Sequence, residues 1–310
     1  MPELCVGERR WAVPTGSNLL DALNDAGLNV PYSCRAGSCH ACLVHCLAGQ
    51  PLDALPEALA LDKHALGWRL ACQCRVVEDL QVALFDPQRD GVPAQVCALD
   101  WFGDVLRVRL RPERAVRYQA GQHVVLWNGS VARPYSLASL PGEEDFLEFH
   151  IDCQRPGAFC DKARGLQVGD VLRLGEFRGG ALHYDPDWQD RPLWLLAAGT
   201  GLAPLWGILR EAVRQGHRGE IRVLHVAGDS AGHYLAGPLQ ELAGVTVELV
   251  MAEQMEQALA GLRLASRQTV ALVCGAPGSV ERFARRLFIA GVPRGQVFAD
   301  VFVEHALELC

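Results

Sequence analysis

Three cysteines stand close together early in the chain. Cys34, Cys39 and Cys42 have the spacing C-x4-C-x2-C, and Cys72 and Cys74 follow further along. One short loop with this spacing supplies three thiolates to a two-iron cluster from one side, while a distant strand or loop supplies the fourth. The loop residues are small, which lets backbone N–H groups approach the sulfurs and stabilise their negative charge. The pattern indicates a metal centre.

Three other uses of these cysteines have to be weighed. A zinc site built on Cys39-x2-Cys42 and Cys72-x-Cys74 would leave Cys34 over, and structural zinc prefers paired C-x2-C knuckles. A Rieske centre needs two histidines in place of two cysteines, and the nearby histidines do not stand in C-x-H pairs. Free cysteines are also often simple packing residues. The spacing favours the two-iron cluster over all three.

Residues 1–90 resemble the plant-type [2Fe–2S] ferredoxins in cysteine spacing and flanking residues. The resemblance implies a β-grasp fold and makes Cys72, in a Cys-Gln pair, the fourth ligand beside Cys34, Cys39 and Cys42. By the same resemblance Cys5, Cys46 and Cys74 are expected to be packing residues. That family commonly has glycine after the second cysteine, and this chain has His40.

Composition limits the class of protein. Half of the residues are hydrophobic and 21% are charged, a normal globular balance. A net charge of −7 argues against nucleic acid as a partner, because phosphate binding needs a basic face. Twelve cysteines behind an N-terminus without an apolar signal core suggest redox chemistry in a reducing compartment, and we expect a cytoplasmic protein. The longest uncharged run, residues 193–209, is too short for a membrane span and predicts a buried strand, turn and helix.

The middle of the chain has little helical periodicity. A polar, turn-rich stretch at residues 86–93 is interpreted as an interdomain linker. Strand-like runs separated by turns follow it and predict a small antiparallel barrel. These runs are residues 95–99, 105–110, 123–127, 146–151 and 171–174.

One tetrapeptide in this region carries chemistry, Arg133-Pro134-Tyr135-Ser136. A flavin needs a cation for its pyrophosphate, an aromatic face for its ring system and a hydroxyl or N–H near its reactive nitrogen N5. On an extended strand, Arg133 and Tyr135 point to one side and Ser136 to the other. Taken alone, the motif favours a strand-end tyrosine and a solvated arginine over a flavin site.

The neighbours of this motif resemble the flavin domain of the ferredoxin–NAD(P)H reductase family. The resemblance implies that Arg133, with Pro134 beside it, binds phosphate, that Tyr135 stacks on the flavin, and that Ser136 approaches N5 as a catalytic residue. The segments that carry the resemblance are residues 118–123, 149–151, 156–160 and 169–170.

Further flavin contacts are implied by the same resemblance. His150 and Ile151 would line the nucleotide, and backbone N–H groups from Gly157 to Cys160 would bind its pyrophosphate. The family usually has serine or threonine at Cys160, and a thiol is a poor donor. Residues 175–179, Gly-Glu-Phe-Arg-Gly, also depart from the family pattern, and no role is carried onto them.

From residue 191 onward, strands and helices alternate. Alternation of this kind predicts a parallel sheet with helices on both faces. The expected strands are residues 193–198, 221–226, 246–251 and 269–274, and the expected helices are residues 203–215, 237–242, 253–264 and 279–290.

A glycine turn, Gly199-Thr200-Gly201, follows the first of these strands, and Pro204 suits the first turn of the helix behind it. Glycines there let the backbone approach a pyrophosphate. Together with Cys274-Gly275 at the end of a later strand, the turn resembles the nicotinamide lobe of the same reductase family.

That resemblance implies where the nicotinamide reacts. Cys274 would lie near its C4 atom, although a buried strand-end thiol is the plainer alternative. NADPH needs a cation for its 2′-phosphate. This chain has Asp229 where the family often has arginine, which predicts a preference for NADH. Phe302, near the C-terminus, is the candidate aromatic that covers the flavin, and a plain core strand is the alternative.

These features predict a multidomain α+β and α/β protein. It has a β-grasp [2Fe–2S] ferredoxin domain at residues 1–90, an antiparallel β-barrel FAD-binding domain at 93–187 and a parallel-sheet NAD-binding domain at 190–310. The whole resembles the reductase component of a multicomponent bacterial oxygenase, which implies that NADH, FAD and the cluster pass electrons to a terminal oxygenase. Two alternatives remain open: another electron-accepting protein, such as a deoxysugar dehydrase, and a non-enzymatic electron-carrier module.

Overall fold

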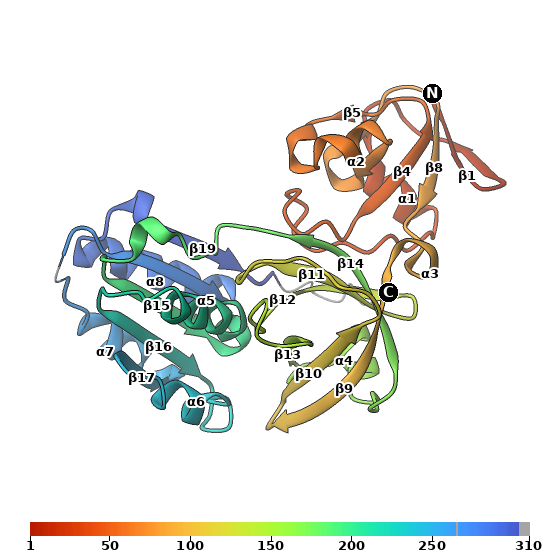
Figure 1. Ribbon diagram of the computed structural model, residues 1–310. Coiled ribbons are helices and arrows are strands. Elements are labelled where there is room, and N and C mark those ends of the chain that lie inside the picture. The colour runs from red at the N-terminus through yellow and green to blue at the C-terminus, as the bar shows by residue number, and fades with distance from the viewer. Residues whose placement is uncertain (265, 304–310) are drawn as a thin grey trace. The chain divides into compact units, whose positions relative to one another are not determined.

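The computed structural model describes residues 1–264 and 266–303 (Figure 1). The chain divides into two compact units, and each is described by itself. The first comprises Met1–Pro93, Val124–Pro134 and Leu172–Glu176, and the second comprises Ala94–His123, Tyr135–Val171 and the chain from Phe177 onward.

The N-terminal segment of the first unit is a mixed sheet crossed by a helix. Strand β1 pairs with β8 in parallel and with β2 in antiparallel fashion, and β4 pairs antiparallel with both β8 and β6. The sheet order is β2 (Arg9–Ala12), β1 (Glu3–Val6), β8 (Leu80–Leu84), β4 (Leu43–Ala48) and β6 (Trp68–Leu70). A smaller sheet has the order β3 (Ser17–Asn18), β7 (Cys74–Val76) and β5 (Leu52–Asp53). This is the β-grasp arrangement that the sequence predicted.

Helix α1 (Leu19–Asp25) starts at a capping asparagine. The Asn18 side chain accepts hydrogen bonds from the backbone N–H groups of Leu20 and Asp21, which satisfies two of the unpaired donors of the first turn. Leu19, Leu20 and Leu23 are fully buried, so the helix covers the sheet with its apolar side. Helix α2 (Leu61–Ala65) was not predicted, because its five residues are too few to show a helical period.

The expected linker at residues 86–93 has structure of its own. Asp86 caps a short helix, α3 (Pro87–Asp90), by accepting a hydrogen bond from the Gln88 N–H. Strand β9 (Val92–Phe102) then begins inside the stretch that the sequence assigned to the linker. Turn-forming residues there mark a capped helix, because aspartate and proline also favour helix starts.

The middle segment supplies a six-stranded sheet. All five predicted strands are present, and β12 is the additional one. The order is β12 (Val131–Ser136), β11 (His123–Asn128), β14 (Val171–Arg178), β9, β10 (Val105–Pro112) and β13 (Leu147–Asp152). In the second unit, β10 pairs antiparallel with both β9 and β13. Helix α4 (Ala158–Ala163) follows β13.

The C-terminal segment is a parallel sheet, as predicted. Its strand order is β17 (Val245–Met251), β16 (Ile221–Ala227), β15 (Leu193–Ala198), β18 (Val270–Gly275) and β19 (Val297–Val301). Its helices are α5 (Leu202–Arg214), α6 (Ala236–Gln240), α7 (Met255–Ala260) and α8 (Pro277–Ala290). Helix α7 is shorter than the predicted helix at residues 253–264.

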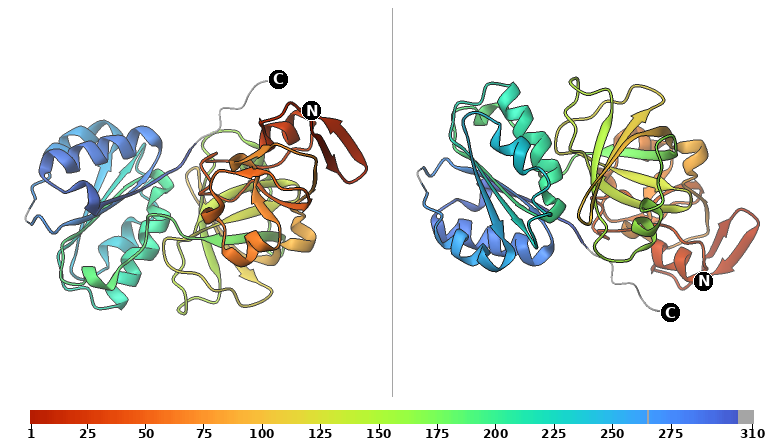
Figure 2. Two further views of the ribbon diagram at one scale, coloured as in Figure 1. Left: turned by 90° about the horizontal axis from the view of Figure 1, so that it is seen from above. Right: turned by 90° about the horizontal axis from the view of Figure 1, so that it is seen from below.

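Both faces of this sheet are covered (Figure 2). Along β15, Leu193 and Leu195 join one apolar core with α5, whereas Trp194 and Leu196 join another with α7 and α8. Strands buried on both faces show as continuous apolar runs, which explains why residues 193–198 are uninterrupted by charge. Among the described residues, no helix is long and apolar enough to cross a bilayer.

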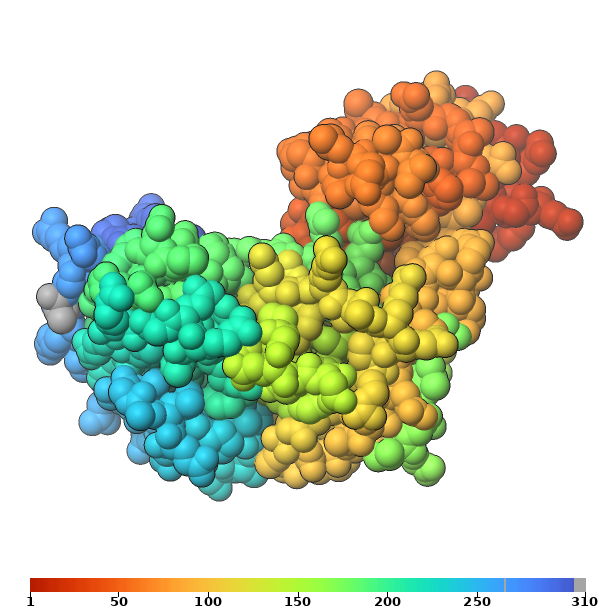
Figure 3. Space-filling view, viewed as in Figure 1, coloured from red at the N-terminus to blue at the C-terminus, as the bar shows by residue number. Residues whose placement is uncertain are grey.

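The loop at residues 139–146 lies against α5 within the second unit. The Arg210 guanidinium of α5 pairs with the carboxylates of Glu143 and Glu144, and Arg214 donates to the Pro141 carbonyl at 2.9 Å. In the space-filling view of Figure 3, the yellow-green atoms of this part of the chain lie directly beside teal atoms of the C-terminal segment. These contacts join the strands of the middle segment to the parallel-sheet segment.

Candidate functional site

The cysteine loop is shaped by left-handed backbone. Arg35, Gly37 and His40 have φ values of 51°, 80° and 57°, a region that residues other than glycine rarely enter. Gly37 is favoured by its conformation, and a Cβ atom there would lie 2.8 Å from the end of the Leu55 side chain, which would have to move. These turns wrap the loop around its own thiols.

The four predicted ligands form two pairs. The Cys34 N–H donates to the Cys39 sulfur at 3.4 Å, and the Cys39 N–H donates to the Cys34 sulfur at 3.3 Å. Hydrogen bonding from Cys39 lowers the pKa of Cys34 to about 4 and raises that of Cys39. In the second pair, hydrogen bonding from Cys42 lowers the pKa of Cys72 to about 7, while that of Cys42 is raised. Each pair therefore contains one thiol poised to ionise.

Two pairs suit a two-iron centre, in which each iron takes two thiolates. Within residues 1–264 and 266–303, no group of three or more histidine, cysteine or acidic side chains is arranged around one metal ion. Cys74 is fully buried, and burial raises the pKa of its thiol, consistent with the predicted packing role. The donor set and its pairing fit a [2Fe–2S] cluster.

Hydrogen bonds from two other side chains hold Cys72, the predicted fourth ligand, in place. The Gln73 side chain donates to the Cys72 sulfur at 3.2 Å and to the Arg35 carbonyl at 2.9 Å. Asn18, which caps α1, donates from its amide to the Cys72 carbonyl at 2.9 Å. Sequence reasoning identified Gln73 by resemblance and missed the second role of Asn18, because a capping residue carries no signal of a distant partner.

The cysteine loop packs on barrel strands of its own unit. Cys39 and Ala41 share an apolar cluster with Val125 and Trp127 of β11 and with Ala132 of β12. The next residue of β12 is Arg133, whose guanidinium donates to the Ala132 carbonyl at 2.9 Å. The first unit thus places the cluster loop on the strand that carries Arg133 and Pro134.

The remaining residues that were predicted to contact the flavin lie in the second unit. Ser136 is buried, and the Tyr135 ring lies 5.0 Å from the Phe159 ring of α4. Gly157 precedes α4 in extended backbone. The Cys160 thiol donates to the Asp152 carbonyl at 3.2 Å. The tyrosine of the motif and the predicted pyrophosphate segment are therefore neighbours.

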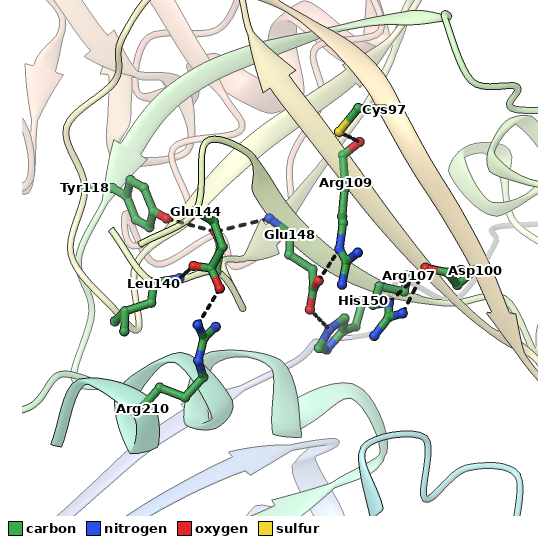
Figure 4. A network of polar contacts seen from close by, with 11 residues as sticks. Cys97, Asp100, Arg107, Arg109, Tyr118, Leu140, Glu144, Glu148, His150 and Arg210 are labelled. Carbon is green, nitrogen blue, oxygen red and sulfur yellow. Dashed lines mark hydrogen bonds and ion pairs between the residues drawn. The ribbon is translucent and has the colours of Figure 1, made fainter. Parts of the chain in front are cut away.

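A buried carboxylate on β13 organises the middle of the second unit (Figure 4). Glu148 accepts hydrogen bonds from Arg109 Nε at 2.7 Å and from His150 Nε2 at 3.0 Å. Burial raises its pKa, but these partners outweigh burial and bring the pKa to about 2. Burial lowers the pKa of His150, so the ring is neutral.

The neutral His150 ring also accepts a hydrogen bond from a tyrosine. An ionised carboxylate only accepts, so His150 Nε2 carries the proton and Nδ1 accepts from the Tyr234 hydroxyl at 3.0 Å. Both ring nitrogens of His150 are therefore hydrogen-bonded to other side chains of the protein. Any contact of His150 or of its fully buried neighbour Ile151 with a nucleotide falls to the backbone. Tyr234 was missed because it lies in a loop far along the chain.

The glycine turn and the end of β18 meet in the structure. A Cβ atom on Gly201 would lie 2.4 Å from the Cys274 carbonyl oxygen, and one on Gly275 would lie 2.9 Å from Ala198. Gly199 has a φ of 55°. Its carbonyl is bonded to Nε2 of His225 on β16 at 3.0 Å. Only glycine allows this close approach of backbones.

The other predicted nucleotide residues surround this turn. Pro204 lies in the first turn of α5, as expected, directly after the segment Gly199-Thr200-Gly201. Cys274 is fully buried, which raises the pKa of its thiol, and the Phe302 N–H donates to the Gly275 carbonyl at 2.9 Å. Asp229 is exposed beyond the end of β16 and accepts from the Gly232 N–H at 2.8 Å.

Comparison with known proteins agrees with this architecture. Residues 6–77 match the family described as the 2Fe-2S iron-sulfur cluster binding domain. The reductase subunit of an aromatic O-demethylase from Amycolatopsis is 32% identical over 258 residues, which are 77% of this chain and 75% of the relative. The chain belongs to the ferredoxin–NAD(P)H reductase family.

Other members of this reductase family align over more of the chain. The reductase component of a naphthalene 1,2-dioxygenase/salicylate 5-hydroxylase system from Ralstonia is 28% identical and covers 93% of this chain and 94% of the relative. The crystal structure of the Amycolatopsis cytochrome P450 reductase GcoB covers 98% of this chain and 99% of that chain, with a TM-score of 0.66 and 25% identity. As a member of the family, the chain is an oxidoreductase that works with a [2Fe–2S] cluster, FAD and NAD(H).

Proposed function

We propose that this reductase takes electrons from NADH and delivers them, through FAD and its own cluster, to a separate terminal oxygenase. The observation that carries the proposal is the packing of the cluster loop on β12, the strand of the flavin motif. When bound, FAD accepts two electrons as hydride and releases them singly to a cluster that takes one at a time.

The residues of the chain would bind FAD and the nicotinamide nucleotide and orient them. Arg133, followed by Pro134, would pair with the flavin phosphates, Tyr135 would supply the stacking surface, and Ser136 would offer its hydroxyl to N5. The glycine turn lets the nicotinamide nucleotide approach closely. Cys274 stays a neutral thiol because burial disfavours its thiolate, so it shapes the hydride-transfer site without competing as a nucleophile.

We infer that NADH is preferred over NADPH. The exposed Asp229 carboxylate, held by the Gly232 N–H, repels a 2′-phosphate and is able to accept hydrogen bonds from ribose hydroxyls. The variant Asp229→Ser should raise kcat/KM for NADPH about tenfold with little change for NADH. Wild-type protein that uses NADPH as well as NADH would contradict this assignment.

The proposed electron acceptor is an oxygenase component that accepts electrons one at a time. A dehydrase that needs the same electrons is the alternative, and a pull-down with the purified reductase distinguishes them. A reducing compartment such as the cytoplasm suits a chain with twelve cysteines.

An absorption spectrum tests the core of this proposal. Protein isolated without oxygen should contain iron, sulfide and FAD, and its visible bands should bleach when NADH is added. Cys72→Ser should lose the cluster, whereas Cys74→Ser, at a buried thiol two positions away, should keep it. Zinc in place of iron, or cluster loss in Cys74→Ser alone, would overturn the assignment.

A further inference from the structure

A second carboxylate, half-buried, lies beside the cluster loop on β14. Glu176 Oε2 lies 3.4 Å from His40 Nδ1, and Glu176 Oε1 lies 2.9 Å from Lys63 Nζ. His40 belongs to the cluster loop and Lys63 to α2, whereas Glu176 belongs to the sheet of the middle segment. We call these three residues the carboxylate bridge. All three lie in the first unit.

The bridge is ionic at neutral pH. Burial raises the pKa of Glu176, but hydrogen bonds from His40 and Lys63 outweigh burial and bring it to about 2. A carboxylate in this state only accepts hydrogen bonds, so His40 presents Nδ1–H to it. Each carboxylate oxygen has its own donor. Because His40 is almost fully buried, its ring has little freedom to leave the carboxylate.

The backbone conformation of His40 indicates a role for its side chain. Its φ of 57° lies in the left-handed region, where a residue other than glycine is strained. Glycine, which plant-type ferredoxins commonly have here, would avoid that strain. Glu176 lies within residues 175–179, another stretch that departs from the family pattern. The two departures contact each other.

Apolar packing runs beside the bridge. The Phe85 ring stacks on the Trp127 ring of β11 with centroids 5.4 Å apart, and the same cluster buries Cys39. Lys63 lies over the Trp68 ring at 5.3 Å, and Trp68 lies next to Phe85 at 6.3 Å. Apolar contacts supply area without direction, whereas the bridge has defined donors and acceptors and so fixes one arrangement.

We propose that His40, Lys63 and Glu176 are positioning residues that hold the cluster loop at a fixed place on the flavin-binding strands. This inference rests on the proposed function, because its consequence is the rate at which electrons pass from flavin to cluster. That rate falls as the separation of the two cofactors grows, so a cluster loop that moves away from these strands should receive electrons more slowly. The bridge supplies no thiolate to the cluster and acts by positioning the cluster loop.

Rapid mixing with NADH in the absence of oxygen tests the bridge. In Glu176→Gln, cluster bleaching should slow about tenfold, while flavin reduction by NADH stays within about twofold. His40→Asn, which tolerates the same backbone, should slow cluster bleaching similarly. Lys63→Ala should have a smaller effect, because this side chain is partly exposed. Glu57→Gln, an exposed charge change in the same segment, is the matched control.

Two further measurements separate the possible failures. The electron paramagnetic resonance spectrum after reduction by dithionite, which bypasses the flavin, should be the same in Glu176→Gln and wild type. Hydrogen exchange of the amides at residues 39–42 should become at least about tenfold faster in Glu176→Gln. Unchanged exchange together with unchanged cluster bleaching would overturn the bridge. If NADH fails to bleach the wild-type cluster, the proposed function falls, and hydrogen exchange alone decides on the bridge.

Discussion

Glu148, which is buried, and Glu176, which is half-buried, are two carboxylates with similar partners but different positions in the fold. Each is held by one histidine and one cationic side chain, and each has a pKa of about 2. Glu148 is bonded to Arg109, its register partner on the neighbouring strand β10. Glu176 is bonded to His40, which lies 136 positions away along the chain.

The difference teaches what each carboxylate stabilises. Glu148 belongs to an antiparallel pair, where residues directly opposite on one face interact, and it continues through His150 to Tyr234. Glu176 joins a loop to a sheet, and its Lys63 partner is partly exposed. We therefore expect Glu148 to matter most for stability and Glu176 to matter most for position.

The largest effect is expected at Glu148. In Glu148→Gln, Arg109 and the fully buried His150 lose an ionised partner, and the free energy of unfolding should fall by about 3 kcal/mol. Urea denaturation at pH 7 measures this. The control is Asp145→Asn, which removes the exposed pair with Arg111 and should cost less than about 1 kcal/mol. Equal losses in the two variants would remove the distinction between buried and exposed pairs.

The next effect is a dependence on pH through His225. Burial lowers the pKa of this histidine to about 4 from an ordinary value of 6.5. The unfolded chain therefore binds a proton that the folded chain does not, so stability is complete above pH 6.5 and falls as the pH drops toward 4. Between pH 7.5 and 5, wild type should lose about 2 kcal/mol more than His225→Gln. Parallel pH profiles would contradict a buried neutral ring.

Tyr234→Phe should have an intermediate effect. The variant leaves His150 Nδ1 buried without a donor, which costs about 1.5 kcal/mol of unfolding free energy. A double variant with Glu148→Gln should lose less than the sum of the two single losses, because the two bonds share one imidazole ring. Additive losses would show that the two contacts are independent.

The smallest loss of stability is expected for Glu176→Gln, at about 1 kcal/mol, because one of its partners is partly exposed. Thermal denaturation in parallel with Glu148→Gln ranks the two carboxylates. A loss at Glu176 as large as that at Glu148 would mean that the carboxylate bridge is a main stabilising contact of the first unit.

Much of this arrangement follows from local sequence. The cysteine spacing predicted the loop whose thiols the structure pairs, and strand alternation predicted β15, β16 and β18 to within a residue or so. Helix α2 and the short helix α3 were missed because such elements are set by capping and packing. The domain boundaries and the individual flavin and nicotinamide contacts stay predictions.

Long-range polar contacts were beyond sequence reasoning for a physical reason. His40 and Glu176 were each noticed as unusual, but a pattern along the chain does not show which distant side chains meet. Tyr234 and His225 likewise acquire their roles only when separate strands and loops come together.

The burial of the inner thiols has a consequence for how the protein is made. Cys39 and Cys42 are 8% and 2% exposed, and a protein that donates iron and sulfide needs direct access to them. Maturation therefore has to precede closure of the loop over β11. If the cysteine loop of a newly synthesised apoprotein closed first, iron and sulfide would not reach the buried thiols.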